Sequence, residues 1–288
     1  MELITMNIKQ LKMLAVLFVS SLMLACSSES GDDDYTEKMA KEHEGETPVA
    51  NASADYEPRM PVETETVEYA TVDGNTITGY MAKAEEADRE LPGIIVIQEW
   101  WGLNDNIRMM TRRLAGEGYA ALAVDLYSGN VADNSQDARK YMSQVNSENT
   151  VDNLKQARQF LADQTGSDDI GVIGWCFGGG WSLQSALAMP DKIDATVIYY
   201  GRLVNDKEKL QKLDMPILGI FGAEDRGIPP EQVKEFESQL KDLGKTVDVN
   251  IYEGAGHAFA NPSGERYNED AAKDAWEKTV AFFNENLK

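Results

Sequence analysis

Cysteine and histidine are scarce in this chain of 288 residues, and their scarcity limits the chemistry that the protein can perform. The two cysteines are Cys26 and Cys176, and the two histidines are His43 and His257. They do not have the spacing of a zinc site, and the chain has no GxxxxGK[ST] phosphate-binding loop. Because Cys26 and His43 fall in the N-terminal region, we expect thiol–imidazole chemistry in the folded part to use Cys176 and His257.

Basic residues are also few. The chain has 27 Lys and Arg against 49 Asp and Glu, which gives a formal net charge of -22. A nucleic-acid site needs a concentrated basic face, so this balance argues against a nucleic-acid partner. The hydrophobic content of 42% is enough for a sizeable core.

The first 25 residues have the pattern of a signal peptide. Lys9 and Lys12 precede the apolar run 13–25, which is too short to cross a bilayer as a free-standing helix. The run ends Leu-Met-Leu-Ala before Cys26 and resembles the lipobox of bacterial lipoproteins, in which the signal is cleaved before a cysteine that then carries lipid. This resemblance implies a membrane anchor on Cys26 and a place in the bacterial cell envelope, on the periplasmic side or the outer surface. The alternative is an ordinary signal peptide with Cys26 as a spare thiol.

Residues 26–61 are acidic and poor in periodic apolar residues. Because the like charges repel and little apolar surface is available to offset the entropy of ordering, we expect a disordered tether. Its first part, Ser-Ser-Glu-Ser-Gly-Asp-Asp-Asp at 27–34, resembles the acidic export tag of surface lipoproteins in the Bacteroidetes, although a solvated spacer explains it equally well.

One folded domain is expected over residues 62–288. Two alternating segments flank the turn at Asp73-Gly74-Asn75 and predict an N-terminal β-hairpin. Short apolar runs then alternate with helical patterns, which is typical of an α/β fold with a mostly parallel central sheet and helices on both faces. The predicted strands are 63–70, 76–81, 93–97, 119–124, 170–173, 195–200, 217–221 and 247–252, and the predicted helices are 107–117, 136–145, 151–162, 181–188, 231–243 and 269–287.

Cys176 lies in the sequence Gly174-Trp175-Cys176-Phe177-Gly178, between the strand that ends at 173 and a predicted helix. A strand, a glycine-framed sharp turn and a helix form the setting of a nucleophile elbow, here with a thiol as the nucleophile. The free N–H groups and positive end of the helix favour a thiolate and a developing oxyanion. The alternative is that Cys176 is a small buried core residue in an ordinary loop.

Two further candidates follow strand ends, where reactive groups of parallel sheets gather. Asp225 comes after the strand at 217–221, and His257 comes after the strand at 247–252. With Cys176 they give the order nucleophile, acid, histidine, which is the chain order of α/β-hydrolases. Taken singly, Asp225 has the alternative of capping the next helix, and His257 of being an isolated loop residue.

From about residue 67 onward the chain resembles the dienelactone hydrolase family of α/β-hydrolases. The motifs that carry this resemblance are QEWWG at 98–102, DLY at 125–127, GWCFGG at 174–179, GAED at 222–225 and GAGHAF at 254–259.

The resemblance implies an α/β-hydrolase fold and hydrolysis of a small-molecule ester or lactone without a cofactor or metal. It implies Cys176 as nucleophile, His257 as base and Asp225 as the group that orients the imidazole. It also implies an oxyanion hole from the backbone N–H groups of Trp100 and Phe177. In the family, the glutamate that matches Glu99 holds the resting cysteine protonated until substrate displaces it; the alternative for Glu99 is to stabilise its loop.

Two departures from the family bear on the substrate. The founding enzymes bind the dienelactone carboxylate with two arginines, and one of these positions is Asn261 here, while Arg139 matches the other poorly. Without a guanidinium fork a carboxylate loses its planar partner, so dienelactone itself is doubtful as a substrate.

Two other classes of protein are alternatives to the hydrolase. One is a non-catalytic surface lipoprotein that binds a ligand in the same cleft. The other is a thiol redox protein, which the lack of a second cysteine near Cys176 disfavours.

We expect the mature protein to partition with detergent and to carry lipid on Cys26, because the apolar run ends at a lipobox-like cysteine. The Cys26→Ala variant should give a soluble or uncleaved form. Mass spectrometry of the mature protein tests this, and an unmodified Cys26 would refute it.

Overall fold

The computed structural model describes residues 29–48, 56–85 and 90–288, and its centre is one eight-stranded sheet with the strand order β1-β2-β4-β3-β5-β6-β7-β8. The predicted signal peptide and Cys26 lie outside the described residues. The strands are β1 (Val62–Val72), β2 (Asn75–Ala84), β3 (Gly93–Ile97), β4 (Ala120–Val124), β5 (Ile170–Trp175), β6 (Ala195–Tyr199), β7 (Ile217–Gly222) and β8 (Val247–Tyr252).

The sheet confirms the predicted architecture of a parallel sheet with an N-terminal hairpin. Strands β1 and β2 pair antiparallel, β2 joins β4 antiparallel, and every pair from β4 through β3 to β8 is parallel. The hairpin turn needs positive φ at both central residues, and Asp73 (φ 49°) and Gly74 (φ 76°) supply it. The carboxyl ends of β3 to β8 therefore meet at one edge of the sheet.

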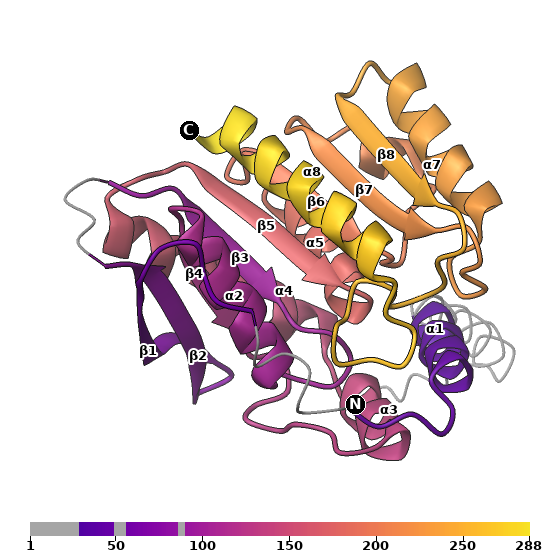
Figure 1. Ribbon diagram of the computed structural model, residues 1–288, viewed down its shortest axis with the longest axis horizontal. Coiled ribbons are helices and arrows are strands. Elements are labelled where there is room, and N and C mark those ends of the chain that lie inside the picture. The colour runs from indigo at the N-terminus through magenta and orange to yellow at the C-terminus, as the bar shows by residue number, and fades with distance from the viewer. Residues whose placement is uncertain (1–28, 49–55, 86–89) are drawn as a thin grey trace, which may run out of the picture.

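Helices cover the sheet on both faces, as the alternating pattern predicts (Figure 1). Helices α2 and α8 pack on one face, and α4 and α5 pack together on the other. The short helix α6 was not predicted. The helices are α1 (Glu29–Glu42), α2 (Asp105–Gly116), α3 (Ser135–Ser143), α4 (Ser147–Thr165), α5 (Phe177–Ala188), α6 (Lys207–Leu210), α7 (Pro230–Asp242) and α8 (Glu269–Leu287).

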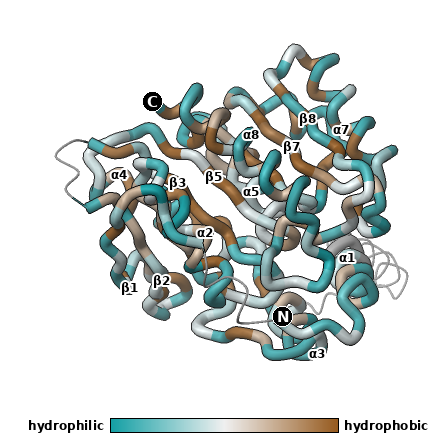
Figure 2. The backbone as a smooth tube through the Cα atoms, in the orientation of Figure 1, coloured by the Kyte–Doolittle hydropathy of each residue, from teal (hydrophilic) through white to brown (hydrophobic). Residues whose placement is uncertain are grey.

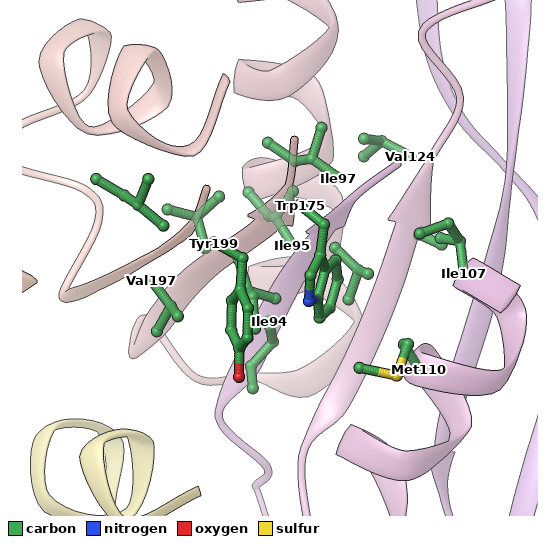
Figure 3. Close-up of a cluster of buried hydrophobic side chains, with 14 of the residues drawn as sticks. Ile94, Ile95, Ile97, Ile107, Met110, Val124, Trp175, Val197 and Tyr199 are labelled. Carbon is green, nitrogen blue, oxygen red and sulfur yellow. The ribbon is translucent and has the colours of Figure 1, made fainter. Parts of the chain in front are cut away.

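The core lies along the central strands. All residues of β3, β4, β5, β6 and β7 are buried, because helices cover both faces of these strands. Figure 2 shows the apolar residues concentrated in the sheet and polar residues on the outer helices. In Figure 3 the rings of Trp175 and Tyr199 lie among the side chains of Ile94 and Ile95. This rigid layer fixes the strand ends that carry the candidate catalytic residues.

The structure differs from the expected disordered tether at its N-terminal half, where helix α1 packs beside α3 at the edge of the sheet that the strand ends reach (Figure 1). Tyr35, Met39 and His43 lie four residues apart, so they form one helical face, and all three are buried. Repulsion among the acidic residues does not prevent this packing, because arginines of the domain pair with three of the glutamates of this segment.

None of the helices in the described ranges is both long enough and apolar enough to span a lipid bilayer.

Candidate active site

Cys176 occupies a sharp turn between β5 and α5, in a backbone conformation that side-chain-bearing residues rarely adopt. Its φ is 55° and its ψ is -115°, and its N–H donates to the Tyr199 carbonyl at 3.0 Å. A Cβ atom on Gly174 would lie 2.2 Å from the Gly178 carbonyl oxygen, and one on Gly178 would lie 2.4 Å from the Gln98 carbonyl oxygen. Only glycine fits at these two positions, so the glycine pattern has the mechanical cause that the sequence suggested.

Asp225 and His257 form a buried pair beside the turn. Asp225 Oδ2 lies 2.8 Å from His257 Nδ1, and its Oδ1 accepts from the N–H groups of Gly227 at 2.8 Å and Ile228 at 2.9 Å. These contacts leave His257 Nε2 as the nitrogen with no hydrogen-bond partner among the described residues. Cys176 Sγ lies within 4.8 Å of a ring nitrogen of His257. The structure thus brings the three predicted residues together in the order expected of a triad.

Electrostatics in this group favour a charged pair of thiolate and imidazolium. Burial raises the pKa of the Cys176 thiol, but the positive charge of the nearby His257 imidazolium, with a further contribution from His43, brings it down to about 6. Burial lowers the pKa of the His257 imidazole, but the Asp225 carboxylate and Cys176 raise it well above its ordinary value. Burial likewise raises the pKa of Asp225, and His257 outweighs this effect and lowers it. Each member of the group therefore stabilises the charge of its neighbour.

The two backbone N–H groups assigned to the oxyanion hole come from different elements. Trp100 lies in the turn after β3, and Phe177 is the first residue of α5. In the described part of the chain neither N–H has a backbone partner outside its own element, which an oxyanion hole requires of its donors.

Glu99 is buried, and two asparagine amides hold its carboxyl group. Its Oε2 accepts from Asn261 Nδ2 at 2.7 Å and from Asn106 Nδ2 at 3.3 Å. Burial, followed by the nearby Cys176 thiolate, raises its pKa to about 8, so Glu99 is protonated at neutral pH. Asn261, at the family's arginine position, therefore supports Glu99.

His43 is the residue that sequence reasoning missed, because it was assigned to a disordered tether. Its Nε2 lies 4.0 Å from Cys176 Sγ, its ring stacks on Trp100 at 4.5 Å between centroids, and its Nδ1 lies 2.7 Å from Glu46 Oε2. Two imidazole–carboxylate pairs thus flank one thiol. The signal that would have found it is the i, i+4, i+8 spacing of Tyr35, Met39 and His43.

These groups also form the one candidate metal cluster within residues 29–48, 56–85 and 90–288. Ligand atoms of His43, Cys176 and His257 all lie within 4.8 Å of one another. A thiolate with two imidazoles suits zinc or copper. A metal bound there would engage both the thiol and the imidazole of the triad.

The Cys176 sulfur has almost no open space beside it. Cys176 is 1% exposed and His257 is 0% exposed. The hollow next to His43, lined also by Trp101 and Asn261, holds about 20 Å³, whereas a cavity of about 600 Å³ lies elsewhere, against Trp276 on α8. A substrate can therefore reach Cys176 only after the residues that cover it have moved.

Comparisons with known proteins agree with this geometry. A model of the dienelactone hydrolase family matches residues 77–287. "Protein usf" of Aquifex pyrophilus is 37% identical over 224 residues, which cover 74% of this chain and 95% of that protein. A "Putative carboxymethylenebutenolidase" of Saccharolobus solfataricus is 33% identical over 252 residues, covering 73% of this chain and 94% of that protein. The crystal structure of a "Putative Dienelactone Hydrolase" from Klebsiella pneumoniae superposes with a TM-score of 0.71 at 28% identity and covers 78% of this chain and 99% of that one.

The low pKa of Cys176 gives a prediction for its alkylation by iodoacetamide. Thiolate is the reactive form, so the rate should be small below pH 6 and rise as pH increases through about 6. The His257→Ala variant should move this midpoint to higher pH, because the imidazolium that stabilises the thiolate is gone. Mass spectrometry of the peptide that contains Cys176 measures the rate; a wild-type midpoint near the ordinary thiol value of about 8.5 would contradict the prediction.

Proposed function

Because the chain belongs to the dienelactone hydrolase family, we propose that it hydrolyses an ester or lactone through a thioester formed on Cys176. The observation that carries this proposal is the buried His257–Asp225 pair, 2.8 Å apart, beside a cysteine held in a glycine-framed turn. This arrangement meets the needs of covalent catalysis, which are a nucleophile, a base next to it and a third group that orients the base.

The first half of the reaction forms the acyl-enzyme. His257 takes the proton of Cys176, and the Sγ lone pair attacks the carbonyl carbon of the ester. The negative charge that develops on the carbonyl oxygen is stabilised by the N–H groups of Trp100 and Phe177, and by the positive end of α5. As the C–O bond breaks, the imidazolium of His257 gives its proton to the leaving alkoxide.

In the second half, His257 takes a proton from water as the water attacks the thioester carbon, and the C–S bond breaks to release the acid. Asp225 keeps the imidazole in one tautomer throughout, because its Oδ2 binds Nδ1 while two backbone N–H groups hold its Oδ1. Glu99 is neutral at pH 7, so it adds no second negative charge beside the Cys176 thiolate.

The substrate class follows from the side chains at the family's carboxylate-binding positions. The Asn261 side chain donates from its amide NH₂ group to Glu99, and its carbonyl oxygen accepts from the Ser263 N–H and hydroxyl groups. Arg139 matches the second of these positions poorly. We therefore propose a neutral ester or lactone as substrate, with Trp100 and Trp101 as its apolar contact surface.

The place of the enzyme is a separate part of the proposal. The lipobox-like sequence before Cys26 supports a lipid anchor in the bacterial cell envelope, with the membrane as a partner of the mature protein.

Substitution of the triad gives the main test of the mechanism. Cys176→Ala should lower kcat by on the order of 10⁶, His257→Ala should come close to this loss, and Asp225→Asn should cost less. The assay is hydrolysis of p-nitrophenyl esters, with Ser182→Ala as the control that keeps its activity, because the Ser182 hydroxyl donates to the Gly178 carbonyl inside α5.

An electrophilic ester should also give a burst of alcohol and a mass shift on the peptide that contains Cys176. Near-full esterase activity in Cys176→Ala would contradict the thioester mechanism. A ligand that stays intact in the cleft of the wild-type protein would point to a binding protein instead.

Substrate charge gives an independent test. We expect kcat/KM for a neutral ester to equal or exceed that for the matched substrate with a free carboxylate. Asn261 stands at one of the family's arginine positions, Arg139 matches the other poorly, and the net charge of -22 repels anions. Added salt should reduce the difference in kcat/KM between the two substrates, since it screens the long-range repulsion between the protein and the anionic substrate. A clear preference for the carboxylate-bearing lactone would contradict this prediction.

A further inference from the structure

We propose that residues 35–46, here called the plug segment, occupy the substrate-binding site and must leave it before an ester can reach Cys176. That the excluded molecule is an ester or lactone rests on the proposed function. The plug segment lies before residue 77, where the match to the family begins. The part of the chain that matches the family contains all three triad residues, so the plug segment is an addition to the catalytic domain.

The plug segment contacts the reacting atoms directly. Met39 Sδ lies 3.8 Å from Cys176 Sγ, and His43 Nε2 lies 4.0 Å from the same atom. Met39 is 0% exposed and His43 is 2% exposed, so both side chains are inside the site. An ester carbonyl must approach to within about 3–3.5 Å of the sulfur in order to react. The space for that approach is taken by the thioether and the imidazole.

The aromatic wall of the site is covered as well. The His43 ring stacks on Trp100 at 4.5 Å and lies edge-on to Trp101 at 6.0 Å between centroids. These are the two tryptophans proposed to contact the substrate. The hollow that remains beside them, about 20 Å³, is too small for an ester.

Charge pairing at the rim holds the plug segment in place. Arg266 pairs with Glu42 and Glu46, and Glu46 in turn pairs with His43. Arg139 pairs with Glu37, and the Arg202 guanidinium lies 5.3 Å from the centre of the Tyr35 ring. These pairs are partly exposed, so each stabilises the docked state only modestly.

The docked state leaves several buried polar atoms of the site without hydrogen bonds. Among the described residues these include Trp100 Nε1, His257 Nε2 and Tyr35 Oη. Each unpaired buried group costs free energy that hydrogen bonding to water or to substrate recovers. The plug segment is therefore held by a few weak ion pairs, over a site in which several buried polar atoms lack hydrogen bonds. A segment bound in this way can be displaced, as a plug on an enzyme must be.

The test compares full-length variants that weaken docking and leave all three triad residues unchanged. Met39→Glu places a carboxylate beside the thiolate and should expel the segment. Glu42→Gln/Glu46→Gln removes the Arg266 pairs from the surface side. Glu44→Gln is the matched control, since Glu44 is an exposed glutamate of the same segment. Equal thermal unfolding midpoints across the set would show that the sheet is intact.

Two readouts are needed. The first is the rate of iodoacetamide modification of Cys176, mapped by mass spectrometry. It should rise about 3- to 10-fold in the double variant, more in Met39→Glu, and stay unchanged in Glu44→Gln. The second is hydrolysis of a p-nitrophenyl ester. Because only the undocked fraction binds substrate, KM should fall by a similar factor while kcat stays constant.

The outcomes separate the plug from the proposed function. Faster alkylation in the docking variants supports the plug even if no ester is hydrolysed. Alkylation and KM equal to wild type in both variants would overturn the plug and leave the hydrolase standing. A loss of kcat with unchanged alkylation would also overturn it, because His43 and its segment would then belong to the catalytic machinery.

Discussion

The close backbone contact at the turn after β5 is the constraint on which the rest of the site depends. The Gly174 and Gly178 backbones approach too closely for any side chain at either position, and this contact holds Cys176 at a φ of 55°. The strained turn places the thiol at the positive end of α5 and opposite the loops after β7 and β8. Asp225 and His257 reach the thiol only because parallel strands bring their carboxyl ends to the same edge.

That position also explains the electrostatics. A thiol buried to 1% exposure would be protonated and inert without a cationic neighbour. The Asp225–His257 pair supplies that neighbour, and His43 adds a second imidazole that faces the same sulfur. The pKa of Glu99 is raised, whereas that of Asp225 is lowered. Burial and the Cys176 thiolate keep the Glu99 carboxyl group neutral, and two asparagine amides hold it in place. The carboxyl groups of Asp225 and Glu99 therefore differ in charge although both are buried, because only Asp225 has a cationic partner.

The strands and the triad positions followed from the sequence because each leaves a local signal. A buried parallel strand is a short apolar run, as in 93–97, and the elbow at Cys176 needs glycines at fixed offsets. The docking of α1 was missed because its cause is not local. Its glutamates look self-repelling until Arg266 and Arg139, more than 90 residues away in the chain, are brought beside them by the fold. The support of Glu99 by Asn261 is likewise a contact between the distant β3 and β8 loops.

Helix α1 begins at Glu29, three positions after the cysteine proposed to carry lipid. While docked, its 14 residues span only about 21 Å, at about 1.5 Å per residue. Released and extended, the same 14 residues reach roughly 50 Å, at about 3.3–3.6 Å per residue. If Cys26 carries lipid as proposed, release of the plug segment would both uncover Cys176 and lengthen the connection between the folded domain and the membrane.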